Sequence, residues 1–107
     1  IQQALMSLLM NSIEAMPRGG KIILNVMLEN SIVKLRIIDE GIGISDKDLP
    51  HIFEPFYSTK EASNGTGLGL AVAYGIIANH KGKIEVEKTS NQGTTFRVVL
   101  PQNEQLV

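Results

Sequence analysis

The chain has 107 residues, enough for one domain with one modest hydrophobic core. Its 43% hydrophobic and 20% charged residues exclude a disordered tail, and a formal net charge of −1 leaves no basic excess for binding nucleic acid. The absence of cysteine excludes disulfides and thiolate metal sites, and no apolar run approaches the roughly 18 residues that a membrane helix needs. We therefore expect a globular domain with no nucleic-acid partner and no direct contact with a membrane.

The chain opens with apolar side chains at helical spacing, and Pro17 followed by two glycines ends the pattern, so we expect a helix over residues 1–16. Ser7, Asn11 and Glu14 fall on one side of this helix. The amide oxygen of Asn11 can ligate a hard cation such as Mg²⁺, although the same pattern also suits an ordinary solvated helix face. The apolar stripe on the opposite side consists of Leu5, Leu9 and Met16.

Four later segments alternate apolar with more polar side chains, which is typical of strands with one buried face. The first two would pair as a hairpin that turns at residues 29–31, and Gly93 would turn the second pair. Between the pairs, Ser45 can cap a short helical turn, residues 57–67 form a polar loop, and apolar spacing predicts a second helix over about residues 68–80. The four segments are 21–28, 31–38, 83–88 and 94–101, and a frayed tail over 102–107 follows them.

Strands with one apolar face need cover on one side only, and two amphipathic helices can supply it. We therefore expect an α+β fold, a two-layer α/β sandwich in which helices cover one face of a mixed, mostly antiparallel sheet. A ligand would enter between the helix layer and the loops.

The segment NGTGLGLAVAYGII places Gly65, Gly67 and Gly69 where the second helix should begin. Glycine lets backbone amides approach an anion, and a helix N-terminus carries unpaired N–H groups and a partial positive charge. The pattern therefore suits phosphate. A flexible loop that runs into a helix is the alternative, and the spacing alone leaves it open.

A second motif, RIIDEGIGIS, runs a strand into Asp39, after which Gly41 and Gly43 allow a tight turn. A carboxylate at a strand end, beside backbone that glycine leaves bare, can accept a hydrogen bond from an exocyclic amine such as N6 of adenine. A solvated carboxylate in an Asp–Gly turn is the alternative.

In the segment IFEPFYSTK, Phe53 and Phe56 flank Pro55 beside the polar loop. The two rings can pin that loop to the core. Lys60 can reach a phosphate as a point charge, or it can simply be solvated.

In order and spacing these segments resemble the catalytic, ATP-binding domain of bacterial sensor histidine kinases. These kinases belong to the superfamily that also contains gyrase, the heat-shock chaperone ATPases and the mismatch-repair ATPases. LLMNSIEAMP resembles the asparagine box, DEGIGI the first glycine box, FEPFYSTK the phenylalanine box and GTGLGLAVAYGII the second glycine box. The closing GTTFRVVLP also fits, and FYSTK followed by GTGLGL is similar to the sporulation-kinase and nitrogen-regulation style of this domain. The resemblance spans nearly the whole chain and implies a Bergerat-type ATP-binding fold.

The resemblance implies a role for each matching residue. Asn11 would be the catalytic residue that ligates the Mg²⁺ bridging the ATP phosphates, and Asp39 would receive the adenine N6 amine, directly and through water. Residues from about 57 to 66 would form a lid over the nucleotide, with backbone amides near the phosphates. Other residues implied to bind ATP are Gly41, Gly43, Phe56, Lys60, Gly65, Thr66, Gly67, Leu68, Gly69, Leu70 and Thr94.

The implied function is that of a protein-histidine kinase, which binds Mg-ATP and transfers the γ-phosphoryl group to a histidine on its own dimerisation domain. A response regulator would be an indirect partner. We expect residues 1–107 to be a single catalytic domain without the family's first strand and without the upstream phosphoacceptor domain, and inactive without that domain. The resemblance implies a cytoplasmic domain, in a parent protein that a membrane segment elsewhere can anchor. Neither His51 nor His80 is assigned as the acceptor.

Two other functions stay open at this point. A serine-directed kinase of the anti-sigma-factor type shares the fold, and the parent sequence upstream would distinguish it. An interaction module without transfer activity is the other alternative, and the presence of Asn11, Asp39 and the three lid glycines argues against it.

Overall fold

The computed structural model describes residues 1–55 and 69–101. In this part of the chain, helices and strands follow the order that the sequence predicts, and a short 3₁₀ helix lies where Ser45 was expected to cap a turn. Their order is α1 (Gln2–Glu14), β1 (Ile22–Glu29), β2 (Ile32–Asp39), η1 (Leu49–His51), α2 (Gly69–Asn79), β3 (Lys83–Ser90) and β4 (Gly93–Pro101). The backbone N–H of Asp48 donates to Oγ of Ser45 at 3.2 Å in the turn that precedes η1, whereas η1 itself has Asp48 as its N-cap and no side-chain cap hydrogen bond.

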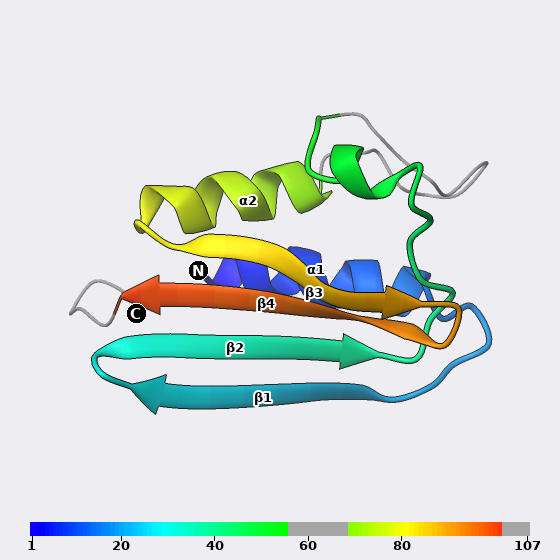
Figure 1. Cartoon of the computed structure of the whole chain (residues 1–107), viewed down its shortest axis with the longest axis horizontal. Coiled ribbons are helices and arrows are strands. Elements are labelled where there is room, and N and C mark those ends of the chain that lie inside the picture. Colours follow the sequence, from blue (N-terminus) through cyan, green and yellow to red (C-terminus); the bar gives the residue numbers. More distant parts are fainter. Residues whose placement is uncertain (56–68, 102–107) are drawn as a thin grey trace.

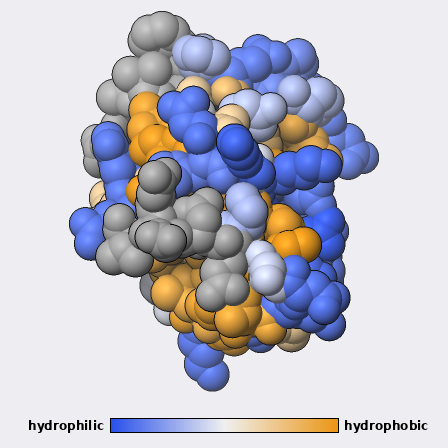
Figure 2. Space-filling model, turned by 90° about the vertical axis from the view of Figure 1, so that its left-hand side faces the viewer, coloured by the Kyte–Doolittle hydropathy of each residue, from blue (hydrophilic) through white to orange (hydrophobic). Residues whose placement is uncertain are grey.

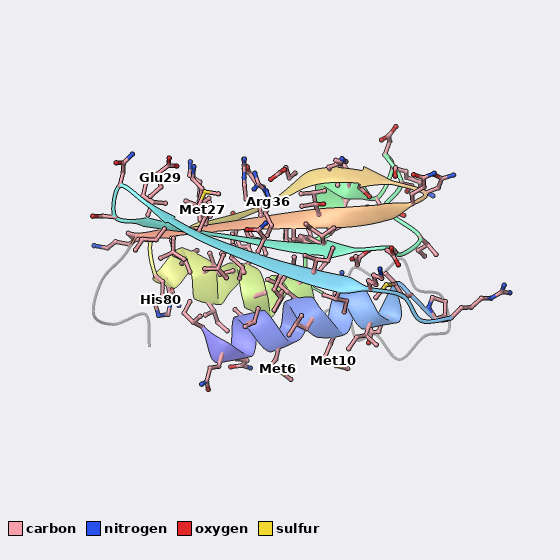
Figure 3. All side chains as sticks on the ribbon, turned by 90° about the horizontal axis from the view of Figure 1, so that it is seen from below. Met6, Met10, Met27, Glu29, Arg36 and His80 are labelled. Carbon is pink, nitrogen blue, oxygen red and sulfur yellow. The ribbon has the colours of Figure 1, made fainter. Side chains whose placement is uncertain are left out.

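The four described strands form one sheet in the order β1-β2-β4-β3. Each pairing among them is antiparallel, where we expected a mostly antiparallel sheet. Both helices lie on the same face of the sheet (Figure 1), and the view from below separates a helix layer from a sheet layer (Figure 3). The predicted two-layer α+β sandwich is therefore confirmed.

Both hairpins turn through two residues. Asn30 and Ser31 join β1 to β2 with φ values of 52° and 63°, the left-handed conformation that two-residue turns require. The second hairpin turns at Asn91 and Gln92, not at Gly93 as expected. Gly93 is the first residue of β4 and pairs with Ser90.

The core lies between the helix layer and the central strands. Phe96 and Ile37 are wholly buried, and Leu8 of α1 and Ile77 of α2 close over them. Along β4, alternate side chains point into this core, which confirms the alternation read from the sequence. The inward residues of β4 are Thr94, Phe96, Val98 and Leu100.

The buried stripe of α1 differs from the predicted one. Ala4, Leu8 and Ser12 are buried, whereas Leu5 and Leu9 are only partly buried at its edge. A helix that lies flat on a sheet buries the residues that face the sheet directly. The residues on its two sides, apolar on one side and polar on the other, therefore lie at the rim of the core. The polar flank consists of Ser7, Asn11 and Glu14, each half-buried.

Ion pairs cover the central part of the sheet face that is turned away from the helices. Arg36 on β2 contacts Glu87 on β3 at 2.8 Å, and Arg97 on β4 contacts Glu85. Figure 3 shows Arg36 and Met27 projecting from that face. Exposed pairs of this kind contribute about 0–1 kcal/mol each. Thr94 and Phe96 of β4 point to the opposite face, toward the helices, so the candidate site is sought on the helix side.

Apolar side chains stay exposed at two places. Met6 and Met10 of α1 point away from the sheet (Figure 3). On β1, Leu24, Val26 and Leu28 are 47%, 67% and 58% exposed, because α1 lies over β2 and α2 lies over β3. Figure 2 shows apolar surface toward the bottom of the face in view, at the level of β1 and β2. Among the described residues, no helix combines the length and the apolar character needed to cross a bilayer.

Candidate functional site

Asp39 ends β2 with its carboxylate held in one orientation. Its side chain is almost wholly buried, and Oδ1 accepts hydrogen bonds from the backbone N–H groups of Gly41 at 2.9 Å and Thr94 at 3.2 Å. The other oxygen, Oδ2, is buried and has no hydrogen-bond partner among the described residues. One carboxylate oxygen therefore stabilises the loop, and the other remains available to a ligand that brings a donor.

A row of polar side chains crosses three strands at this end of the sheet. Asp39 on β2 lies opposite Thr94 on β4, which lies opposite Thr89 on β3. Oγ1 of Thr89 is 2.8 Å from Oγ1 of Thr94, and the N–H of Ile44 donates to Oγ1 of Thr89 at 2.9 Å. The row links the aspartate to Ile44, the last residue of the first glycine box. Thr94 was predicted from the family resemblance, but Thr89 was not predicted at all.

The two glycines of the first box are needed for close packing within the protein. A Cβ atom on Gly41 would lie 2.7 Å from the carbonyl oxygen of Ala15, and Gly43, with φ of +81°, would place one 2.0 Å from the carbonyl oxygen of Ser90. The N–H of Ile42 also donates to the carbonyl of Ala15 at 3.1 Å. The loop is thus wedged between the C-terminal end of α1 and the end of β3. Its predicted position beside a base stays a prediction.

The helix α1 brings a second buried polar atom to this region. Ser12 is wholly buried, and its Oγ has no hydrogen-bond partner among the described residues. It lies one turn before Ala15, on the side of the helix that faces the sheet, while its neighbour Asn11 is half-buried on the polar flank. Ser12 was not predicted as a site residue, because its one signal in the sequence is a hydroxyl on an otherwise apolar stripe of the helix.

Some of the remaining predicted site residues lie within the residues that the structure describes, and others lie outside them. Gly69 begins α2, and a Cβ atom on it would meet no atom of the described residues within 4 Å, while Leu70 packs against the core. Phe53 lies 5.3 Å from Tyr74 and 6.4 Å from Phe96, measured between ring centroids, so it pins its segment to the core as expected. The predicted residues outside the described ranges are Phe56, Lys60, Gly65, Thr66, Gly67 and Leu68.

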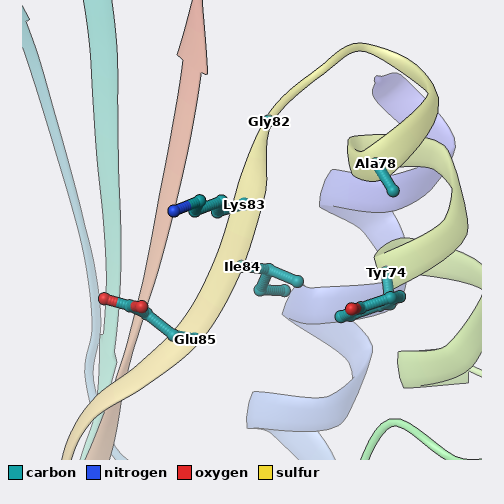
Figure 4. A pocket seen from close by; sticks show the side chains of 6 residues that line it. All are labelled: Tyr74, Ala78, Gly82, Lys83, Ile84 and Glu85. Atoms are coloured by element: carbon teal, nitrogen blue, oxygen red, sulfur yellow. The ribbon is translucent and has the colours of Figure 1, made fainter.

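Two further features of the described residues bear on the site. A hollow of about 240 Å³ lies between Tyr74 of α2 and Ile84 of β3, and no residue of the Asp39 row lines it (Figure 4). Within residues 1–55 and 69–101, no three acidic, histidine or cysteine side chains gather in a way that could hold a metal ion.

Comparison with known proteins identifies the family. The model for "Histidine kinase-, DNA gyrase B-, and HSP90-like ATPase" matches residues 1–104, a range that contains every predicted site residue. The chain belongs to this ATPase family. The family assignment confirms the resemblance drawn from the ordered glycine, asparagine and phenylalanine boxes.

The relatives are sensor kinases. Sporulation kinase E of Bacillus subtilis (strain 168) is 44% identical over 102 residues, which cover 94% of this chain and 14% of that protein. The catalytic domain of histidine kinase ThkA is 36% identical with a TM-score of 0.79, over 94% of this chain and 64% of that one. Full-length ShkA, solved in complex with AMPPNP, is 27% identical with a TM-score of 0.80, over 92% of this chain and 20% of that one. The chain thus resembles the catalytic ATPase domain of histidine kinases and spans a small part of the curated relatives.

Proposed function

We propose that this domain binds Mg-ATP where β2 ends and β4 begins, and transfers the γ-phosphoryl group to a histidine on another domain of its parent protein. Membership of the ATPase family and the sensor-kinase relatives support the nucleotide and the reaction class. The structure of ShkA with AMPPNP supports a nucleotide of this type in a similar fold.

The observation that carries the proposal is the buried Oδ2 of Asp39, which has no hydrogen-bond partner among the residues that the structure describes. A buried acceptor without a donor costs about 1–3 kcal/mol, and a ligand that supplies the donor recovers this free energy on binding. The exocyclic amine of adenine is such a donor, while Gly41 and Thr94 keep the carboxylate turned toward it. The domain would therefore recognise the base through a carboxylate that is already oriented before the nucleotide arrives.

The donor set fits Mg²⁺ only as part of a nucleotide complex. Mg²⁺ usually takes one or two protein oxygens and fills its other positions with water and phosphate, and Asn11 provides one amide oxygen on the flank of α1. Bound Mg²⁺ would neutralise charge on the phosphates. Asn11 would hold the metal complex over the helix, and the second glycine box would bind the phosphates through backbone N–H groups. The contribution of the domain is then positioning and electrostatic complementarity, as in other phosphoryl transfers.

A titration with a fluorescent ATP analogue, with and without Mg²⁺, tests the binding half of the proposal. We expect binding that Mg²⁺ strengthens and that unlabelled ATP displaces much better than inorganic triphosphate. Displacement by triphosphate as effective as that by ATP would show that the base is not recognised. Absence of any binding would favour the interaction module.

A test of phosphoryl transfer, the second half of the proposal, requires the dimerisation domain of the parent protein. Incubation of the domain with γ-labelled ATP and the parent's dimerisation domain should label that domain on histidine. Labelling of a serine on a separate protein would instead identify a serine-directed kinase.

A further inference from the structure

The edge strand β1 has the composition of a strand that is paired on both sides. Among the described residues it pairs with β2 alone, in a regular register without a bulge, so its outer backbone groups face away from the sheet (Figure 1). Proteins usually protect such an edge with charges, proline or a bulge, and residues 22–28 contain neither a charge nor a proline. The apolar side chains of β1 that are 46–67% exposed are Ile23, Leu24, Val26, Met27 and Leu28.

The opposite edge of the sheet is protected. Its strand, β3, carries Lys83, Glu85, Glu87 and Lys88, and its pairing with β4 shifts register between Val86 and Lys88. Charges and a bulge both hinder the addition of another strand. Of the two edges, β1 is therefore the one suited to pairing, and an assembly formed through β1 would stop at two copies.

The sequence of β1 is complementary to itself in the antiparallel direction. When Asn25 of one copy lies opposite Asn25 of another, Lys21 of each copy lies opposite Glu29 of the other. Opposite charges and apolar side chains that face one another across two strands stabilise a sheet, and a shift of the register would lose both charge pairs. The apolar pairs in this register are Ile22 with Leu28, Ile23 with Met27 and Leu24 with Val26.

We propose that two copies of this chain associate through β1, in an antiparallel pairing centred on Asn25 that joins their two four-stranded sheets. The two-fold axis of such a pairing is perpendicular to the sheet, so the helices of both copies lie on the same face. Leu24 lies opposite the buried Ile37, which places the even-numbered residues of β1 on the helix side. Because α1 lies over β2, the pairing would bring together two apolar rows that no helix of their own chain covers.

The pairing leaves the candidate nucleotide site of each copy accessible. Asp39 lies opposite Ile22, so β1 separates it from the joint, and the two-fold axis places the two sites at opposite ends of the joined sheet. ATP should therefore bind to the monomer and the dimer equally well. The inference does not rest on the proposed function, and either can fail without the other.

Sedimentation equilibrium of the 107-residue chain at increasing concentration is the first test. We expect the average mass to rise from the monomer value of 11.7 kDa toward twice that value and no further. Val26→Lys places a charge in the middle of the edge and should keep the chain monomeric at the same concentrations. Ile42→Lys is the matched control, because Ile42 in the loop after β2 is 64% exposed and Val26 is 67% exposed. It should dimerise like wild type.

A charge reversal tests the register. Lys21→Glu places like charges opposite each other at both ends of the pairing, and should raise the dissociation constant of the dimer about three- to tenfold. Combining Lys21→Glu with Glu29→Lys restores opposite charges and should return the constant close to the wild-type value. Failure of this rescue would contradict the proposed register.

Cysteine cross-linking locates the two-fold axis, and it does not depend on the folding of Val26→Lys. The chain has no cysteine of its own. Residues directly opposite each other in antiparallel strands have Cα atoms about 4.5–5.5 Å apart, within the range of a disulfide, so Asn25→Cys should form a linked dimer on mild oxidation. In Val26→Cys the two Cα atoms would lie roughly 8 Å apart, and this control should not link.

Three results would overturn the proposal. A wild-type chain that stays at the monomer mass at every concentration would leave the edge to another partner, such as a strand of the parent protein. Dimerisation that survives Val26→Lys would place the contact elsewhere on the molecule. Equal cross-linking of Asn25→Cys and Val26→Cys would show random collision and no fixed pairing.

Discussion

The backbone N–H of Thr94 donates a hydrogen bond of 3.2 Å to Oδ1 of Asp39, so a residue that the family resemblance implies to bind ATP also joins the end of β2 to the start of β4. Gly41 donates to the same oxygen from the loop. The two oxygens of one carboxylate therefore have separate tasks, because Oδ1 stabilises the fold and Oδ2 is left for the ligand. Substitutions that keep one oxygen and replace the other can separate these tasks.

Asp39→Asn keeps an oxygen for the two backbone N–H groups and replaces Oδ2 with a donor. We expect its free energy of unfolding in urea to fall by about 1 kcal/mol or less, while its affinity for ATP falls at least tenfold because two donors then face each other. Asp39→Ala leaves both buried N–H groups unpaired and should lose about 2–4 kcal/mol of stability as well as ATP binding. Equal stability of the two variants would contradict the structural role of Oδ1. Unchanged ATP affinity in Asp39→Asn would contradict the role of Oδ2.

Asn11 offers a test of the metal. Asn11→Ala should fold normally, because alanine is the better helix former, yet its affinity for ATP in Mg²⁺ should fall to the value measured with a chelator present. The measurement is a pair of ATP titrations, with Mg²⁺ and with EDTA. Gln3→Ala, on the exposed side of the same helix, is the matched control and should retain the full Mg²⁺ effect. A Mg²⁺ effect that survives Asn11→Ala would place the metal elsewhere.

Gly43 is the glycine of the first box at which a side chain would meet the closest contact. With φ of +81° and a would-be Cβ 2.0 Å from the carbonyl oxygen of Ser90, Gly43→Ala should cost about 2 kcal/mol or more in denaturant unfolding, because both strain and overlap must be relieved. Gly75→Ala is the control, because a Cβ on this exposed residue of α2 meets nothing within 4 Å. It should leave stability unchanged or raise it by up to about 1 kcal/mol. Equal effects at the two positions would contradict the wedged loop.

The parts of the fold that periodicity encodes were predictable from the sequence. Alternation predicted the strands, and the order of the boxes indicated the family. The turn of the first hairpin was predicted at residues 29–31 and lies at 30–31, whereas that of the second was misplaced at Gly93 and lies at residues 91–92. Thr89 was not predictable, because a β-bulge has no reliable signature in one sequence and strict alternation points to Lys88 instead. The inward stripe of α1 was misplaced for a related reason. Hydrophobicity assigns leucines to the core, but the orientation of the helix on the sheet decides that Ser12 is wholly buried while Leu5 and Leu9 lie at the edge.

Ser12 offers a test of a buried hydroxyl on the side of α1 that faces the sheet. Its buried Oγ has no partner among the described residues, so Ser12→Ala should raise the free energy of unfolding without nucleotide by about 1 kcal/mol. If the hydroxyl contacts the bound nucleotide, the stabilisation that saturating ATP gives should at the same time become smaller than in wild type. Urea unfolding with and without ATP measures both effects, and Ser7→Ala on the half-buried flank of α1 serves as the control. A loss of stability in Ser12→Ala without nucleotide would mean that the hydroxyl already has a partner within the protein.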